Sequence, residues 1–319
     1  MAVDTLPITA RTVGGTSQRR GTALGCAVAL ASCTLLVVQL HGVALGAVFA
    51  DLRVGWLLAA ILATAASLAA AAHNLSAFAP IRLRAVDTLR AQLAVCGLRV
   101  IAPSAVTTPA IGARYLTRSG LTVAEALAVV GTAQAAQLVM TIAVVAVLAA
   151  AGSSGLHIPA GTTGLVLAAA VVVVTVGVLV GRRVVAVRRI VSAVLGAVRV
   201  LAAHLRQRPM RVVTGLGASG ALTIAHVVAF ACCVHAVGAH ASVLSLTVVY
   251  LGAASAGSFV PTPAGVGPVE AAMIGGLCAA GVSLPTATGA TVLTRLVTVW
   301  APAIPGWLAL RSLRRSGLL

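Results

Sequence analysis

The chain has 319 residues, of which 60% are hydrophobic, 8% charged and 3% aromatic, and its mean hydropathy is +1.09. This composition excludes an ordinary soluble domain and indicates an integral membrane protein built from α-helices. The net charge of +17 comes from 22 arginines and no lysine, and the arginines cluster in short segments between apolar runs. Such clusters indicate orientation in a membrane and contact with anionic lipid heads, so nucleic acid is not an expected partner.

The N-terminal third predicts a tail, two crossings and a surface helix. Residues 1–20 are polar and are expected to form a disordered cytoplasmic tail. Residues 21–40 are long enough to cross a bilayer and are expected to stay attached rather than to be cleaved as a signal, and residues 54–72 return. Residues 82–100 combine arginines with an apolar stripe of helical period, which predicts an amphipathic helix on the cytoplasmic interface. The stripe consists of Val86, Leu89, Leu93, Cys96 and Val100.

The segment that follows, residues 103–120, contains Pro103 and Pro109 and is too short and too broken to cross. It predicts a re-entrant segment entered from the cytoplasm, with Arg114 and Arg118 near the interface in contact with lipid heads. Further full crossings are predicted at residues 124–151, 162–180, 212–237 and 287–310. The segment 182–211 holds eight arginines, and it is the strongest cytoplasmic marker, so both termini are expected in the cytoplasm.

One stretch is broken where the surrounding sequence is apolar. It reads Phe259-Val-Pro-Thr-Pro-Ala-Gly-Val-Gly-Pro-Val-Glu270. Its three prolines and two glycines exclude an uninterrupted helix. Within a bilayer, broken backbone is tolerated only where it lines a cavity or is buried in protein. Pro261, Pro263, Gly265 and Gly267 are therefore predicted to lie on a substrate path.

Glu270 and Arg295 are the only ionisable residues deep in the final third. Each alone would cost about 2.5–3.5 kcal/mol at a helix centre, which predicts that they pair across two helices. Three interpretations compete: a structural ion pair, a pair that gates or binds a lipid head, and a proton relay. The proton relay is the weakest because no second intramembrane carboxylate is visible.

Histidine and cysteine patterns predict no metal or other cofactor, because no C-x-x-C or H-E-x-x-H motif occurs. His226 and His235 fall on one predicted helix and are expected to be packed or hydrogen-bonded rather than to bind a metal.

The two broken regions resemble each other, since each places two prolines before a glycine, at Gly120 and at Gly281, and then a long apolar helix. This predicts an inverted repeat with halves 83–181 and 212–311. The alternative is chance, because proline and glycine are common in this composition. The predicted fold is all-α: a polytopic transmembrane bundle with six full crossings and two interrupted regions, in one membrane domain, 21–311, with a cytoplasmic tail at 312–319.

The broken stretch, Leu293-Thr-Arg295 and the segment 300–310 resemble the lysylphosphatidylglycerol synthase transmembrane region, also called the flippase-like family. The family pattern is P-x-P-G-G-x-G-x-x-E followed by a distant arginine. Glu270 and Arg295 match it, whereas Ala264 stands where the pattern has its first glycine. The resemblance implies a protein of the bacterial inner membrane that translocates or binds a phospholipid or a lipid-linked amphiphile.

Some family members also carry a cytosolic aminoacyl transferase. The longest predicted cytoplasmic loop, residues 182–211, is far too short for a catalytic domain, and the sequence shows no nucleophile–base pair. No enzymatic activity is therefore expected, and membrane lipids are the expected partners. The alternative is a non-transporting membrane scaffold that supports a separate lipid- or glycan-modifying enzyme.

Overall fold

The computed structural model describes residues 52–319 apart from 103, 153–198, 200–201, 204 and 260–266, and the described part contains helices and no strand. Four of its helical segments are long and apolar enough to cross a membrane. They are α3 (Val54–Phe78), α6 (Val123–Gly152), α9 (Pro209–Ala236) and the continuous segment Leu284–Arg315. These correspond to the second, third, fifth and sixth predicted crossings. The all-helical polytopic fold is thereby confirmed, while the crossings at 21–40 and 162–180 lie outside the described residues.

The last crossing changes its winding in the middle. It consists of α12 (Leu284–Arg295), a π-helical turn η2 (Leu296–Trp300) and α13 (Ala301–Arg315). Pro302 and Pro305 follow the π-helical turn directly and remove two backbone amide donors. The helix widens where these hydrogen bonds are lost, as helices often do beside proline.

Shorter helices fill the spaces between the crossings: α4 (Ala85–Arg99), α5 (Ser104–Arg118), α10 (Val243–Phe259) and α11 (Pro268–Ala279). α5 runs through Pro109, so the expectation of a break there was wrong. Pro109 lies in the second turn, where its missing amide costs a single hydrogen bond. The 15 residues of α5 extend about 22 Å, less than the roughly 30 Å of hydrocarbon in a bilayer. α5 is thus too short to cross, and its re-entrant placement stays a prediction.

The apolar stripe predicted on α4 is divided between two environments. Val86 and Leu89 are 60% and 36% exposed, whereas Cys96 is buried. The buried face consists mainly of small residues, with Ala91 and Ala94 almost fully covered. The helix is confirmed, and its buried face is made mainly by small residues, with Cys96 as the one buried member of the stripe.

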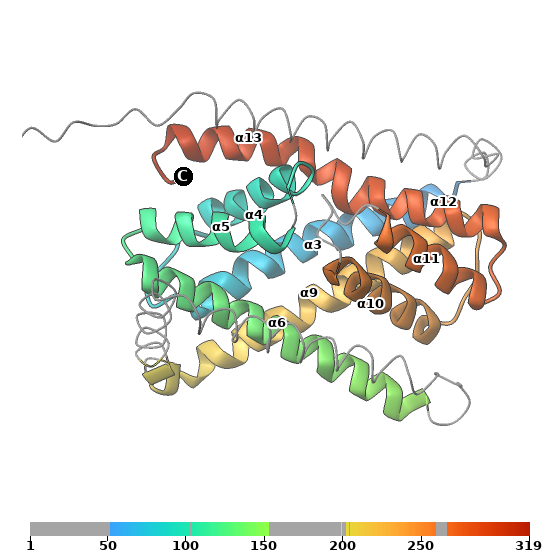
Figure 1. Ribbon diagram of the computed structural model, residues 1–319, viewed down its shortest axis with the longest axis horizontal. Helices are drawn as coiled ribbons and strands as arrows, with labels where there is room; N and C mark the ends of the chain where they lie inside the picture. The colour runs from blue at the N-terminus through green and yellow to red at the C-terminus, as the bar shows by residue number, and fades with distance from the viewer. Residues whose placement is uncertain (1–51, 103, 153–198, 200–201, 204, 260–266) are drawn as a thin grey trace, which may run out of the picture.

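Buried apolar residues form two main clusters. One joins α3, α4, α5, α6 and α13, and Tyr115 and Leu116 are among its most buried members. The other joins α9, α10, α11 and α12 around Phe230, Leu246 and Leu277. Figure 1 shows the first group toward the left and the second toward the right. The described residues of the two interrupted regions therefore pack in different clusters, and the inverted repeat stays a prediction.

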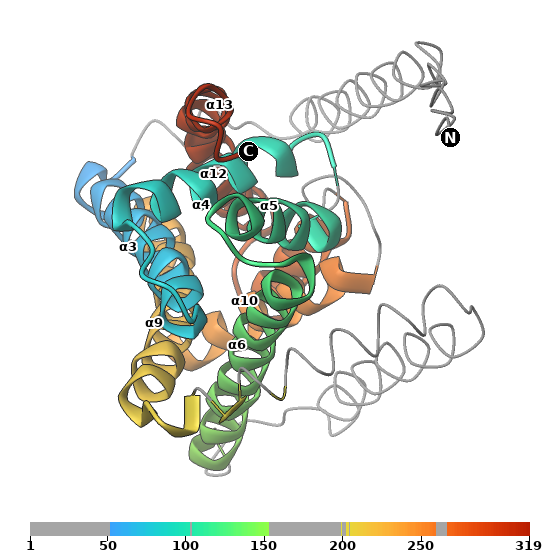
Figure 2. The same cartoon turned by 90° about the vertical axis from the view of Figure 1, so that its left-hand side faces the viewer.

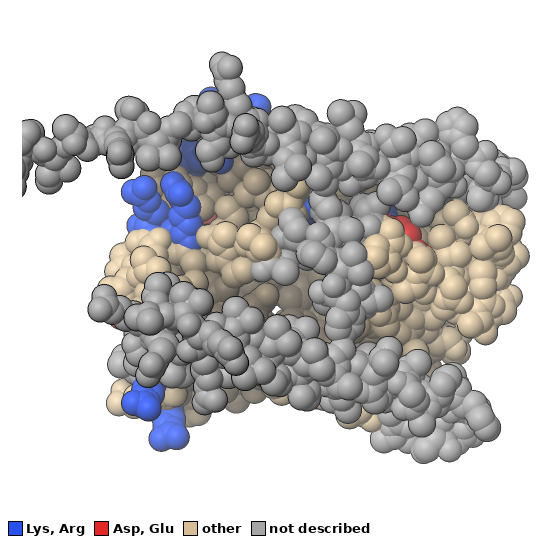
Figure 3. Space-filling view, viewed as in Figure 1, with Lys and Arg blue, Asp and Glu red and all other residues tan. Residues whose placement is uncertain are grey.

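Arginines gather at one end of the bundle, where α3, α5 and α13 end and α9 begins. This end is held together by the apolar cluster that contains Phe78 and Leu313, and by a hydrogen bond of 2.8 Å from Arg211 Nη1 to the Ala79 carbonyl. Figure 3 shows most of the positive side chains at the left of the face in view. Its arginines are Arg82, Arg84, Arg114, Arg118, Arg206, Arg208, Arg211, Arg311, Arg314 and Arg315. At the other end, Arg53 is the one arginine among the described residues.

α4 and α13 approach each other at two glycines. A Cβ added at Gly306 would meet the Leu93 carbonyl oxygen and, at 2.6 Å, the Gly97 nitrogen. A Cβ added at Gly97 would lie 3.0 Å from the Gly306 carbonyl carbon. The obstructing atoms are backbone atoms, so no side-chain rotation can relieve the clash. Figure 2 shows α4 directly against the C-terminal helix.

Gly306→Ala is expected to lower the free energy of unfolding by about 1–3 kcal/mol, because the two backbones must separate. Thermal unfolding in detergent measures the effect. Gly217→Ala is the matched control, since no atom lies within 4 Å of the added Cβ and alanine favours a helix. Equal melting temperatures for the two variants would contradict the close contact.

Candidate functional site

The predicted break between helices is present, and a glycine lies directly before the second helix, α11. Gly267 has φ of +100°, a region that side-chain-bearing residues rarely adopt, and α11 starts at the next residue, Pro268. Proline suits the first helical position because its missing amide would have no partner there. Pro261, Pro263 and Gly265 lie outside the described residues.

Glu270 and Arg295 form the predicted ion pair across α11 and α12. Arg295 Nε lies 2.7 Å from Glu270 Oε1, and the two side chains are only 9% and 4% exposed. Such a pair offsets the desolvation cost of each charge when its geometry is good. The pairing predicted from the isolated charges is present in the structure.

Glu270 also holds the start of its own helix. The Gly267 amide donates to Glu270 Oε2 at 2.7 Å, and the carboxylate lies in the first turn of α11, where the helix dipole favours a negative charge. Gly267 has no side chain to return the bond, so among the described residues Glu270 supplies the side-chain part of this cap. One carboxylate thus fixes both the break and the position of α12.

A cavity of about 170 Å³ with both polar and apolar walls lies at mid-bundle between α3, α4, α5, α6, α9 and the last crossing. His226 and Leu222, near the middle of α9, form part of its wall, and Thr298 and Pro302 face it from the last crossing. Neither Glu270 nor Arg295 is among the residues that line it. Thr298 is one helical turn beyond Arg295, so the ion pair fixes the helix that supplies this wall. The remaining polar lining comes from Thr64, Ser67, Asn74, Gln92, Arg99, Thr108 and Gln134.

Two lining residues have polar atoms without a partner among the described residues. Asn74 is 5% exposed, and its Nδ2 donates at 3.4 Å to the Ala133 carbonyl, which leaves Oδ1 unpaired. Arg99 Nε is likewise buried and unpaired. A buried polar atom without a partner costs about 1–3 kcal/mol, and each one calls for a water, ion or ligand.

Most other hydroxyl groups around the cavity are satisfied within their own helices. Thr64 Oγ1 donates to the Ala60 carbonyl at 2.9 Å, and Ser67 Oγ donates to the Thr64 carbonyl at 2.8 Å. Their oxygen lone pairs remain able to accept from a bound group. The contrast with Asn74 and Arg99 singles out those two as the atoms that lack a protein partner.

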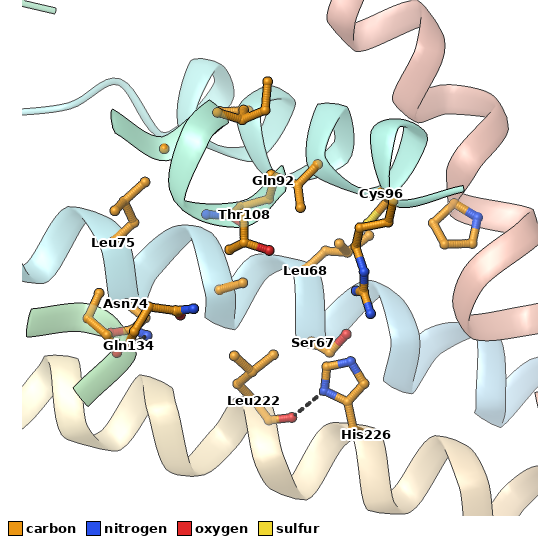
Figure 4. A pocket seen from close by; sticks show the side chains of 18 of the residues that line it. Ser67, Leu68, Asn74, Leu75, Gln92, Cys96, Thr108, Gln134, Leu222 and His226 are labelled. Carbon is orange, nitrogen blue, oxygen red and sulfur yellow. Dashed lines mark hydrogen bonds between the residues drawn. The ribbon is translucent and has the colours of Figure 1, made fainter. Parts of the chain in front are cut away.

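The tautomer of His226, a residue that lines the cavity, is defined by its hydrogen bond. Its Nδ1 lies 2.9 Å from the Leu222 carbonyl, and because a carbonyl only accepts, Nδ1 carries the proton. The other ring nitrogen of a neutral imidazole is then an acceptor. Figure 4 shows this bond, with His226 toward one end of the cavity and Asn74 and Gln134 toward the other. The expectation that His226 and His235 are hydrogen-bonded is confirmed, since His235 Nδ1 lies 3.0 Å from the Ala239 carbonyl.

Arg114 and Arg118 are exposed on α5, the helix whose Thr108, Ile111 and Gly112 face the cavity. Arg114 is two residues beyond Gly112, so α5 runs from the cavity wall toward the arginine-rich end. Their contact with lipid heads remains a prediction. Sequence reasoning missed Asn74, Gln92 and Gln134 and assigned Arg99 to the membrane interface. The available signal for Asn74 and Gln134 was an amide on a largely apolar helix, whereas α4 carries several polar residues and gave no such signal.

These features define a class, an integral helical membrane protein with a partly polar cavity among its crossings. The profile of the family described as Lysylphosphatidylglycerol synthase TM region matches residues 22–306. The chain belongs to this family, as its broken stretch, Glu270 and Arg295 indicated. No curated protein matches the chain.

Arg295→Gln is expected to lower the free energy of unfolding by about 3–5 kcal/mol, because Glu270 stays buried without its cation. Glu270→Gln keeps an oxygen for the Gly267 amide and is expected to cost a similar amount, because Arg295 loses the carboxylate of its ion pair. The Glu270→Gln/Arg295→Gln double variant is expected to recover part of the loss. Denaturant unfolding in detergent measures all three.

Exchanging the two charges is expected not to restore stability. An arginine at position 270 cannot accept the Gly267 amide hydrogen and places a positive charge at the start of α11. A charge-exchanged protein as stable as the wild type would contradict the capping role of Glu270.

Proposed function

We propose that this protein takes the head group of a phospholipid or lipid-linked amphiphile into the mid-bundle cavity and lets it pass between the two leaflets. The acyl chains stay in the bilayer during the passage. The chain supplies the path and no bond-making chemistry, so an aminoacyl transfer would need a separate enzyme. The observation that carries the proposal is the cavity itself, with the unpaired Asn74 Oδ1 and Arg99 Nε among its walls.

The depth of the cavity supports passage rather than surface binding. α9 contributes Leu222 and His226, which lie near the middle of a helix of 28 residues. A helix of this length extends about 42 Å, so these residues are near the centre of a membrane that it crosses. A polar head meets its highest barrier there, and the polar groups in the cavity wall lower that barrier.

The arginine-rich end sets the orientation that we propose. Cytoplasmic ends of crossings carry an excess of arginine, so this end faces the cytoplasm of a bacterial inner membrane and both termini lie there. Arg114 and Arg118 then attract anionic heads at the surface from which α5 leads to the cavity. Glu270 and Arg295 hold the last crossing in the position that shapes the cavity, and Pro261, Pro263, Gly265 and Gly267 keep their predicted place on the substrate path.

The burial of the Glu270–Arg295 pair away from the cavity favours one element of the scaffold alternative, in which the pair is purely structural. The two proposals differ in what a filled cavity does. If a larger side chain fills the cavity, a scaffold still keeps its partner enzyme active, whereas a translocation path no longer lets lipid pass.

Ala71→Leu is expected to abolish lipid translocation, because the added side chain enters the small cavity that Ala71 lines. The measurement is the rate at which a fluorescent phospholipid of the inner leaflet becomes accessible to a quencher outside reconstituted vesicles. Ala65→Leu is the matched control on the exposed face of the same helix and is expected to leave the rate unchanged. A normal rate in well-folded Ala71→Leu would refute the cavity as the path.

Arg114→Gln/Arg118→Gln is expected to lower the translocation rate several-fold at low fractions of anionic lipid and to leave it unchanged at high fractions. Each arginine near an anionic surface contributes about 1 kcal/mol to local lipid enrichment. The control is Arg315→Gln, an exposed arginine on another helix. An equal loss at every lipid composition would assign the two arginines to the passage step instead of to collection.

A further inference from the structure

The charge balance of the cavity restricts the head group that it accepts. The chain contains five carboxylates. Of these, Asp4 and Asp51 lie outside the described residues, and the other three are engaged elsewhere. Asp87 pairs with Arg84 and Arg90, and Glu270 pairs with Arg295.

Glu125 is the fifth, and it is engaged at the start of α6, where it accepts the Thr122 amide and hydroxyl hydrogens at 2.8 Å. No carboxylate is among the residues that line the cavity, whereas Arg99 is. Arginine keeps its positive charge under all ordinary conditions. The described wall therefore offers a cation and no anion.

An ammonium group would be poorly received in such a site. In a phospholipid that carries an ammonium, this group already balances the charge of the lipid's own phosphate, so the charge of Arg99 stays uncompensated, and a like charge nearby costs several kcal/mol in surroundings of low dielectric constant. A phosphate suits the same wall, because it supplies a negative charge that balances the guanidinium of Arg99 and accepts hydrogen bonds from it.

The neutral part of the lining fits hydroxyl groups. Asn74 Oδ1 is an unpaired acceptor, and its orientation is set because the opposite amide nitrogen faces the Ala133 carbonyl. His226 offers a second acceptor through its outer ring nitrogen. Gln92 and Gln134 add amide groups that both donate and accept. A polyol beside a phosphate would form hydrogen bonds with both the donors and the acceptors of this wall. An alkyl ammonium only donates, so the amide donors of Gln92 and Gln134 would have no acceptor.

The size of the cavity points the same way. A cavity of about 150 Å³ admits a benzene ring, so about 170 Å³ accommodates a group the size of a phosphate or a glycerol. An aminoacyl ester adds a whole amino acid to the head and exceeds this space.

We propose that the cavity selects a head group that carries phosphate and hydroxyl groups and excludes one that carries an ammonium, whether ethanolamine or an aminoacyl ester. The ligand chemistry is that of a glycerophosphate, held by Arg99 at the phosphate and by Asn74 and His226 at the hydroxyl groups. That the head group belongs to a lipid is taken from the proposed function, on which this inference rests. Under this proposal the chain does not accept lysylphosphatidylglycerol, the aminoacylated lipid after which its family is named.

The test uses the full chain in detergent micelles, with native mass spectrometry to measure retention of short-chain lipids. The probes are phosphatidylglycerol, phosphatidylethanolamine and lysylphosphatidylglycerol, and separate arms contain glycerol 3-phosphate or inorganic phosphate as competitors. Wild-type protein is expected to retain phosphatidylglycerol at least ten-fold better than either ammonium lipid.

Arg99→Gln is expected to weaken phosphatidylglycerol retention about ten- to hundred-fold, the usual effect of losing a charge-assisted hydrogen bond. Arg90→Gln, on the exposed side of the same helix, is the control and is expected to bind as the wild type does. Arg99→Lys keeps the charge and is expected to keep the preference among lipids, which separates loss of charge from loss of folding.

The outcomes separate this inference from the proposed function. Equal retention of all three lipids, or unchanged binding by Arg99→Gln, overturns the selectivity and leaves lipid binding intact. Strong binding of glycerol 3-phosphate or phosphate in the absence of any bound lipid supports the head-group chemistry but overturns a lipid as its source. Retention of none of the probes overturns both.

Discussion

The carboxylate of Glu270 is the contact on which the C-terminal half of the structure depends. It accepts the amide hydrogen of Gly267 and faces Arg295 Nε, each at 2.7 Å, in a region where its side chain is 4% exposed. A helix that ends inside an apolar layer leaves backbone groups unpaired, and a charge in the same layer needs a partner. Glu270 meets both requirements with its two oxygens. The break before α11 is thereby compatible with a buried position, and α12 is held against it.

The same requirement explains the buried hydroxyl groups. Thr288, Thr291 and Thr294 on α12 each donate to the carbonyl four residues earlier, at 2.7–2.8 Å. Such threonines can be buried without a partner from another helix. Against this background the unpaired atoms of Asn74 and Arg99 stand out, because neither residue finds a complete set of partners within the described chain. Among the described residues, two of the three buried side-chain atoms without a partner belong to residues that line the cavity, and the third, Gln137 Oε1, lies on α6 about one turn beyond Gln134.

Much of the fold was predictable because it follows from local chemistry. Apolar runs of sufficient length identified α3, α6, α9 and the last crossing, and the prolines and glycines before Glu270 identified the interruption. The Glu270–Arg295 pair followed from the cost of two isolated charges. The helix through Pro109 was not predicted, because a proline in an early turn loses only one hydrogen bond and tertiary packing compensates for it.

The cavity was beyond the reach of sequence reasoning for a different reason. Its lining comes from helices far apart in the chain, from Thr64 on α3 to Pro302 on α13. No periodicity joins such residues, and Arg99 reads locally as one more interfacial arginine. Only the packing of the helices shows that it shares a space with Asn74 and His226.

The glycine contact between α4 and α13 has a mechanical consequence. Gly97 and Gly306 bring the two backbones so close that neither helix can slide or rotate against the other without collision. Both helices also line the cavity, through Gln92, Val95 and Arg99 on α4 and Pro302 on α13. The two helices therefore form one rigid wall of the cavity. Any widening that admits a larger head group must then come from the other helices that line the cavity, α3, α5, α6 and α9.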